Sequence, residues 1–86
     1  MDDLQQARAA IDEIDAEMAA LFERRMQAVG QVARYKAATG KPVFDPARED
    51  AVIAKNIARL QDETLRGYYR SFLQQVRALC QEGTQE

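Results

Sequence analysis

The stretch LQQARAAIDEIDAEMAALFERRMQAVGQVARYKA, residues 4–37, decides the fold of this 86-residue chain. It contains no proline, one glycine and mostly residues of high helix propensity. Its apolar residues recur at spacings of three and four, which is typical of one face of an amphipathic helix. The stretch therefore predicts one helix, roughly 50 Å long at about 1.5 Å per residue. The apolar positions are Leu4, Ala7, Ile11, Ile14, Met18, Leu21, Ala28, Val32 and Tyr35.

An apolar face of that length needs more cover than the rest of the chain can provide. A chain of 86 residues buries only roughly 60–65% of the surface that it exposes when unfolded, so its own core is small. We expect most of the face to be core, and we expect the same helix of a second copy to cover it. The sequence therefore predicts a helical homodimer.

Strong local signals end the long helix and begin the next one. Gly40 suits a left-handed helix C-cap, and Pro42 cannot continue a helix. Asp45 can cap free N–H groups, and Pro46 suits the first helical position. A second helix is therefore expected to start at residue 46.

Apolar periodicity divides the remainder into two shorter helices. We expect one over residues 46–60, a polar break at 61–64, and another over 65–81 that Gly83 and the polar tail end. The sequence shows no strand pattern and no repeat, so it predicts an all-α fold of three helices in a single domain, residues 1–86. The positions expected to face inward are Ala47, Val52, Ile53, Ile57, Leu60, Tyr69, Phe72, Leu73, Val76, Leu79 and Cys80.

Composition excludes several classes of function. The net charge is -2, which provides no basic field to attract nucleic acid. No apolar run approaches the length of a membrane span, and the acidic N-terminus is unlike a signal peptide. The single cysteine fits a reducing compartment. We therefore expect a cytoplasmic protein without a nucleic-acid or membrane partner.

The absence of histidine restricts the chemistry further. Without histidine, and with one cysteine, the chain has no imidazole base and no plausible zinc site, so we expect no metal. An enzyme of this composition would have to use carboxylate, ammonium and guanidinium groups. Arginine supplies 9 of the 12 basic residues, and its planar guanidinium suits bidentate recognition of carboxylates or phosphates.

Two cations interrupt the apolar face of the long helix. Arg25 occupies the site between Leu21 and Ala28, and Lys36 follows eleven residues later, roughly 20° from the same direction. A cation on a buried face is costly unless an anion pairs with it. Two interpretations remain open. Acidic side chains of another helix satisfy the cations, or the cations line a pocket for an anionic ligand.

A third cation stands at the start of the second helix. Arg48 falls in its first turn, where the helix dipole disfavours a cation by a few tenths of a kcal/mol, and Glu49 follows. Arg8 lies roughly 26 Å from Arg25 along one helix, so it could join the same ligand only from the partner of an antiparallel dimer. With Lys36, such a site would carry four cations and one carboxylate, which matches a small dianion bearing a hydroxyl group.

These motifs resemble the all-helical, type II class of prokaryotic chorismate mutases. The resemblance covers residues 4–80. It implies an intertwined helical homodimer with two active sites, each completed by Arg8 of the other chain. The motifs, at matching intervals, are R-x-x-I-D-x-I-D at residues 8–15, R-M at 25–26, Y-K at 35–36 and D-P-x-R-E at 45–49.

The resemblance also implies roles for the charged residues. Arg8 and Arg25 would hold the substrate carboxylates, and Arg48 would help to bind them. Lys36 would reach a carboxylate and the ether oxygen, and with Arg25 and Glu49 it would form the catalytic set. The reaction, an intramolecular Claisen rearrangement of chorismate to prephenate, needs no cofactor and no metal. It needs orientation and electrostatic stabilisation of the ether oxygen.

The resemblance places further substrate contacts at the ring hydroxyl and the ether oxygen. Glu49, with Asp45, would bind the hydroxyl. Near the end of the third helix the family often has a serine and, four residues later, a glutamine that contacts the ether oxygen. In an ungapped alignment these substrate-binding positions are Cys80 and Thr84. Gln81 and Gln85 stand nearby, and the choice among Thr84, Gln81 and Gln85 for the ether contact is left open.

Two other functions compete with the mutase. The isochorismate-pyruvate lyase relative of the same fold resembles the mutase at Arg8 and Arg25 but lacks the D-P-x-R-E motif. A non-catalytic helical dimerisation module would explain the long apolar face without any activity. The D-P-x-R-E motif favours the mutase, which would act in aromatic amino acid biosynthesis.

Overall fold

The chain folds into three helices, as the sequence predicts. The computed structural model describes residues 2–42 and 44–84, with side chains described as far as residue 82. No strand occurs among these residues, so the all-α prediction is confirmed. Within the same residues, no helix combines the length and hydropathy needed to span a bilayer. The elements are α1 (Asp3–Thr39), α2 (Pro46–Ala58), the short 3-10 helix η1 (Glu63–Leu65) and α3 (Arg66–Thr84).

Side-chain and glycine caps define the ends of α1. The Asp2 carboxylate accepts a hydrogen bond from the backbone N–H of Gln5 at 2.7 Å, and the Gln5 side chain accepts one from the backbone N–H of Asp2 at 3.3 Å. This reciprocal pair satisfies two of the helix's free donors. At the other end, Gly40 adopts a φ of 74°, the left-handed conformation that the sequence predicts there.

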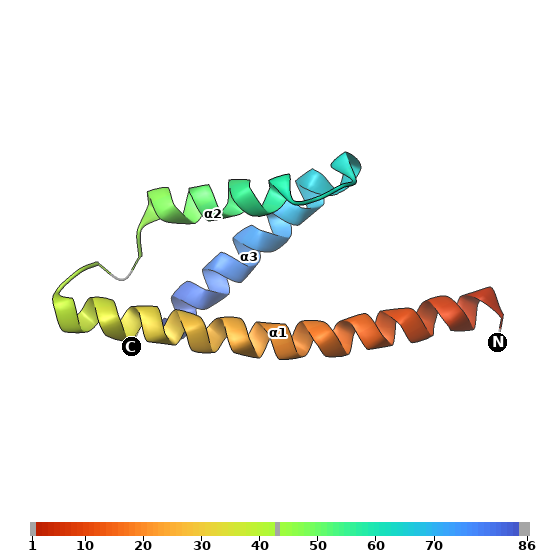
Figure 1. Cartoon of the computed structure of the whole chain (residues 1–86), viewed down its shortest axis with the longest axis horizontal. Coiled ribbons are helices and arrows are strands. Elements are labelled where there is room, and N and C mark those ends of the chain that lie inside the picture. The colour runs from red at the N-terminus through yellow and green to blue at the C-terminus, as the bar shows by residue number, and fades with distance from the viewer. Residues whose placement is uncertain (1, 43, 85–86) are drawn as a thin grey trace.

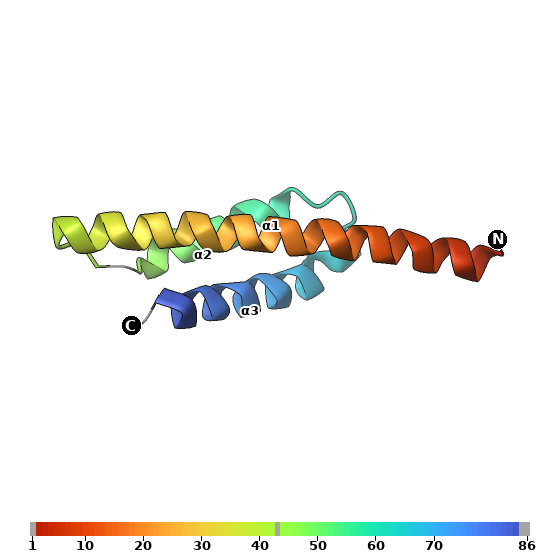
Figure 2. The same cartoon turned by 90° about the horizontal axis from the view of Figure 1, so that it is seen from below.

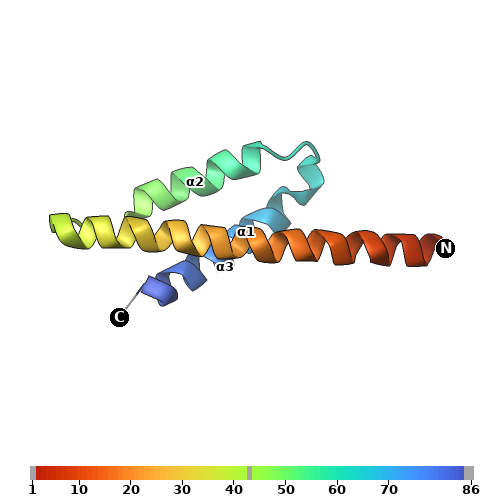
Figure 3. The ribbon, with the colours of Figure 1, turned by 60° about the horizontal axis from the view of Figure 1, so that its bottom comes forward.

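The three helices form an open arrangement (Figure 1). α2 and α3 are joined through η1 and pack against each other, while the C-terminal part of α3 approaches α1 (Figures 1 and 3). The N-terminal part of α1 projects beyond both other helices (Figure 2). The radius of gyration is 16.2 Å, whereas a compact chain of this length would have about 12 Å. A single chain is therefore elongated rather than globular.

The core of a single chain is small. Among the described side chains, the buried apolar residues are Ile57 of α2 and Val76 and Cys80 of α3. All three are at positions expected to face inward. Phe72 and Leu79 were also expected to face inward, but in one chain they are 46% and 48% exposed. The core thus sits where α3 packs on its neighbours, and the outer face of α3 lies open.

The apolar face of α1 is uncovered in a single chain, which agrees with the expectation that the rest of the chain is too small to cover it; the second copy that would make it core stays a prediction. All of α1 is described, and none of its residues is buried. The reason is geometric, because α2 and α3 are short and only α3 packs on α1. The large apolar residues that α1 leaves exposed are Leu4, Ile11, Ile14, Met18, Leu21, Phe22, Val32 and Tyr35.

The ends of the shorter helices differ from the prediction. α2 ends at Ala58, two residues early, and Asp62 caps η1. The Asp62 carboxylate accepts hydrogen bonds from the hydroxyl and from the backbone N–H of Thr64. Both bonds, chiefly that of the hydroxyl, lower the pKa of the Asp62 carboxyl below its usual value. At the other end, α3 continues through Gly83 to Thr84 instead of stopping at residue 81. A glycine inside a helix costs only about 1 kcal/mol relative to alanine, so it does not have to end the helix.

Candidate functional site

A cleft of about 390 Å³ lies between the C-terminal half of α1 and the start of α2. It draws charged and apolar side chains from three consecutive segments of the chain. Its lining residues are Arg25, Ala28, Val29, Val32, Ala33 and Lys36 of α1, Phe44 and Asp45 of the link, and Arg48, Glu49 and Val52 of α2.

The periodicity of α1 brings its two cations to the cleft. Arg25, Val29, Val32 and Lys36 follow one another at spacings of four, three and four, which keeps them on one face over three turns. The Lys36 side chain is half-buried, whereas Arg25 is exposed. The long helix thus presents an ammonium and a guanidinium to the same space, about 16 Å apart along its axis.

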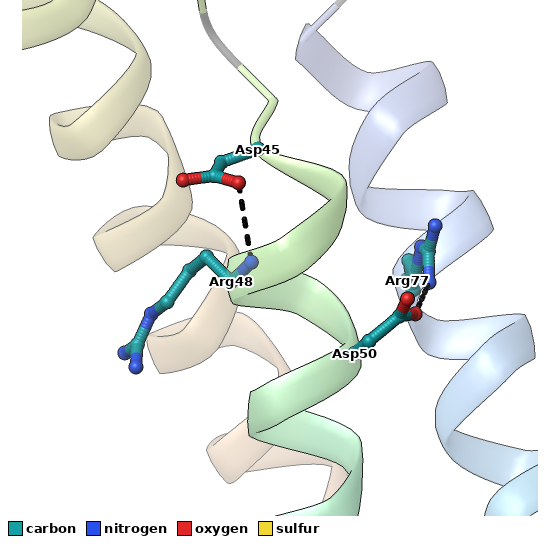
Figure 4. Close-up of polar contacts among 4 residues, drawn as sticks. All are labelled: Asp45, Arg48, Asp50 and Arg77. Atoms are coloured by element: carbon teal, nitrogen blue, oxygen red, sulfur yellow. Dashed lines mark hydrogen bonds and ion pairs between the residues drawn. The ribbon is translucent and has the colours of Figure 1, made fainter.

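The start of α2 supplies the opposite wall. Asp45 Oδ1 accepts a hydrogen bond from the backbone N–H of Arg48 at 3.2 Å, and Pro46 takes the first helical position. This cap orients the first turn so that Arg48 and Asp50 extend to opposite sides of α2 (Figure 4). Arg48 lines the cleft, while Asp50 accepts a hydrogen bond from Arg77 of α3 at 3.0 Å. Asp45 therefore both begins the helix and lines the site.

The cleft combines three cations with two carboxylates. Two ion pairs within the chain, Arg66 with Glu63 and Arg77 with Asp50, lie outside the cleft. Asp45 and Glu49 face the same space without forming an ion pair with a cleft arginine. A pocket for an anionic ligand remains one of the two interpretations of the cations. An anion would meet converging positive charge at a helix N-terminus.

Cys80 contacts Arg25, one of the residues that line the cleft. The Arg25 guanidinium donates a hydrogen bond from Nη1 to the Cys80 Sγ at 2.9 Å, and the Cys80 thiol donates to Sδ of Met26 at 3.5 Å. Cys80 is only 4% exposed and does not line the cleft. In a single chain its sulfur contacts Arg25, and the expectation that Cys80 binds substrate stays a prediction.

The remaining predicted site residues lie elsewhere. Arg8 is exposed on the projecting part of α1 and does not line the cleft of its own chain. Gln81 is half-buried on α3 and does not line the cleft either. The backbone of Thr84 lies in the last turn of α3, but its side chain and the whole of Gln85 lie outside the described residues.

The apolar wall of the cleft was missed as part of the site. The sequence predicts Val32 and Val52 as core positions and assigns Val29 and Phe44 no role in the site, yet all four line the cleft. Helical spacing could have found the two α1 valines, because both lie on the face between Arg25 and Lys36. An apolar wall with a few converging charges is typical of a small-molecule site.

The chemistry available in this cleft is binding and electrostatic stabilisation. Among the described residues, no group of histidine, cysteine, aspartate and glutamate side chains could hold a metal ion. The cleft offers guanidinium and ammonium donors for anionic oxygens and carboxylates for a hydroxyl group. Such a site can hold a flexible dianion in one conformation and stabilise negative charge that develops within it.

Comparisons with known proteins point in the same direction. The family described as chorismate mutase type II matches residues 7–82. The T-protein of Haemophilus influenzae (strain ATCC 51907 / DSM 11121 / KW20 / Rd) is 38% identical over 53 residues, which are 62% of this chain. The matched segment spans only 14% of that relative's length. No solved structure matches the chain significantly.

Proposed function

The chain belongs to the chorismate mutase type II family, and on that premise we propose that it converts chorismate to prephenate in the cleft between α1 and α2. One observation carries the proposal: a single cleft gathers Arg25, Lys36, Arg48 and Glu49 on apolar walls. Chorismate, a dianion with a ring and a hydroxyl group, has the chemistry that this lining complements. The reaction would serve aromatic amino acid biosynthesis, and we propose the cytoplasm as its location.

Binding would first select the compact conformer of the substrate. Arg25 and Arg48 would hold the carboxylates from opposite walls, and each charge-assisted hydrogen bond would contribute about 1.5–3 kcal/mol. Glu49, with Asp45, would accept a hydrogen bond from the ring hydroxyl. Val32 and its apolar neighbours would confine the ring, so that the two carbons that must join are held close together.

Bond breaking would then be assisted electrostatically. As the ether C–O bond breaks and the new C–C bond forms, electron density accumulates on the ether oxygen. The Lys36 ammonium, half-buried in the cleft, would stabilise that charge without transferring its proton. The electrons move within the substrate, so the rearrangement needs neither a nucleophile nor a redox partner.

A second copy of the chain would complete the site. The accessible surface is 7016 Å², whereas a compact protein of 9.7 kDa exposes about 5,100 Å². A dimer that removed this excess of about 1,900 Å² from each chain would have an interface in the size range of obligate homodimers. The exposed apolar residues of α1 supply the surface for such an interface. Antiparallel pairing of the two α1 helices would bring Arg8 of one chain toward Arg25 of the other.

The test of the proposed function is a direct assay. Purified protein is expected to consume chorismate, measured as loss of the substrate's ultraviolet absorbance, and to form prephenate. The same protein is offered isochorismate in parallel. Turnover of isochorismate far above that of chorismate would assign the lyase function instead. A folded protein that consumes neither substrate would be the non-catalytic dimerisation module.

Replacing Arg48 by alanine is expected to lower kcat/KM roughly 10- to 150-fold, which corresponds to one lost charge-assisted bond of about 1.5–3 kcal/mol. The helix content should not fall, because Arg48 contributes only its backbone N–H to the cap and its side chain opposes the helix dipole. Circular dichroism and chorismate kinetics check the two expectations. Arg59→Ala at the opposite end of α2 is the control, because Arg59 does not line the cleft. Equal losses in both variants would contradict a specific role for Arg48.

A further inference from the structure

One turn of α3 connects the two walls of the cleft. From this turn Arg77 donates to Asp50 on α2 at 3.0 Å, and Cys80 accepts from Arg25 on α1 at 2.9 Å (Figure 4 for the first contact). α3 packs on both α1 and α2. The relative placement of the cleft cations therefore depends on α3, although no described residue of α3 lines the cleft.

The two contacts differ in their exposure to solvent. Asp50 is 76% exposed at its side chain, so its ion pair with Arg77 is screened by solvent and adds little. Cys80 is 4% exposed, so its sulfur, although a weak acceptor, meets the charged donor where water is largely excluded. The contact with Arg25 is thus the one that can hold a cleft side chain in place.

Restraining the Arg25 side chain would lower the conformational entropy that it loses when a ligand binds. Arg25 is exposed and lines the open cleft, where a free arginine would sample many rotamers. A guanidinium restrained by one hydrogen bond keeps its other N–H groups available and loses less entropy when a carboxylate binds. The proposed function assigns Arg25 to that carboxylate, so its orientation bears on substrate affinity.

We propose that Cys80 is a positioning residue, which orients the Arg25 guanidinium toward the carboxylate of the bound dianion through its buried sulfur. The expected effect on substrate affinity rests on the proposed function, whereas the contact between Cys80 and Arg25 does not. In this role Cys80 contacts Arg25 and not the substrate. The thiol acts as a hydrogen-bond acceptor, and no covalent or redox step is involved.

Kinetics of Cys80 variants test whether the contact with Arg25 affects substrate affinity. Cys80→Ala is expected to raise KM for chorismate about three- to tenfold with kcat nearly unchanged. Without the contact, the conformational entropy of the Arg25 side chain is lost only when the substrate binds, which weakens binding. Cys80→Ser retains an acceptor and is expected to stay within about twofold of the wild type. Val76→Ala is the matched control, since Val76 is a buried residue of the same helix, one turn earlier. It should lower the melting temperature without changing KM.

Nuclear magnetic resonance of the arginine side chains tests the contact independently of activity. In wild type and Cys80→Ser, the Arg25 Nε–H signal is expected to show restricted motion, which Cys80→Ala should release while Val76→Ala does not. An inactive wild type with an ordered Arg25 would overturn the proposed function and leave the contact standing. An Arg25 that is equally mobile in wild type and Cys80→Ala, or a KM that rises equally in the Ala and Ser variants, would overturn the positioning role.

Discussion

Lys36→Ala is expected to lose about 10²- to 10³-fold in kcat, the usual cost of removing one preorganised donor from a developing oxyanion. Lys36 is the single ammonium among the residues that line the cleft, and it lies half-buried at the C-terminal end of the long helix. The arginines can hold carboxylates, but in the proposed reaction the negative charge develops on the ether oxygen. Removing the ammonium therefore affects the transition state more than the bound substrate, and kcat should fall more than KM rises.

The control for this experiment is the neighbouring Lys41. Its Nζ lies 5.6 Å from the centroid of the Tyr35 ring and it does not line the cleft. Lys41→Ala removes an equal charge close to the same end of α1 and should leave turnover within about twofold. Both variants should keep the helix content of the wild type. A Lys36→Ala protein that retained a tenth or more of the wild-type kcat would refute the role proposed for Lys36.

Mixing two inactive variants is expected to restore activity if Arg8 acts in trans. Arg8→Ala and Arg25→Ala should each lose most activity as homodimers, because every site lacks one carboxylate ligand. In a heterodimer, one site would carry both defects and the other would carry none. With random exchange of subunits, about a quarter of all sites would be intact, so about a quarter of wild-type activity should return.

The matched control mixes two single variants whose altered residues both lie on α1 and line the same cleft. Arg25 and Lys36 line the same cleft of a single chain, so a heterodimer of Arg25→Ala with Lys36→Ala has no intact site and should remain inactive. Light scattering must first show a dimer in the wild type, and tagged subunits must show exchange. Exchange without recovered activity would contradict shared sites, and an active monomer at micromolar concentration would contradict the dimer itself.

The helices were predictable where their signals are local. The apolar spacing of α1, the left-handed Gly40 and the Asp45–Pro46 start are each encoded within a few residues, and the structure confirms them. The C-terminal ends of α2 and α3 were placed two or three residues wrong. Neither end has a signal as strong as Gly40, because residue 59 is an arginine in the right-handed conformation and Gly83 stays helical.

Part of the site was predictable for the same reason. Arg25 and Lys36 share a face because a helix repeats its directions, and a sequence contains that period. Their meeting with Arg48 and Glu49 depends on how the chain reverses between α1 and α2, which periodicity does not specify. The charge pattern suggested that grouping and the resemblance to a known family implied it; the family match over residues 7–82 confirms the family.

By itself, the sequence determined three helices, the caps at Gly40 and Asp45, and the face of α1 that carries the cations. These features depend on interactions between residues a few positions apart. Only the tertiary structure decided that the sulfur of Cys80 meets Arg25, a residue 55 positions away, instead of facing the cleft. It also decided that α1 stays uncovered in one chain. Both results depend on how α3 packs across α1, and such packing depends on shape and burial over the whole molecule rather than on local spacing.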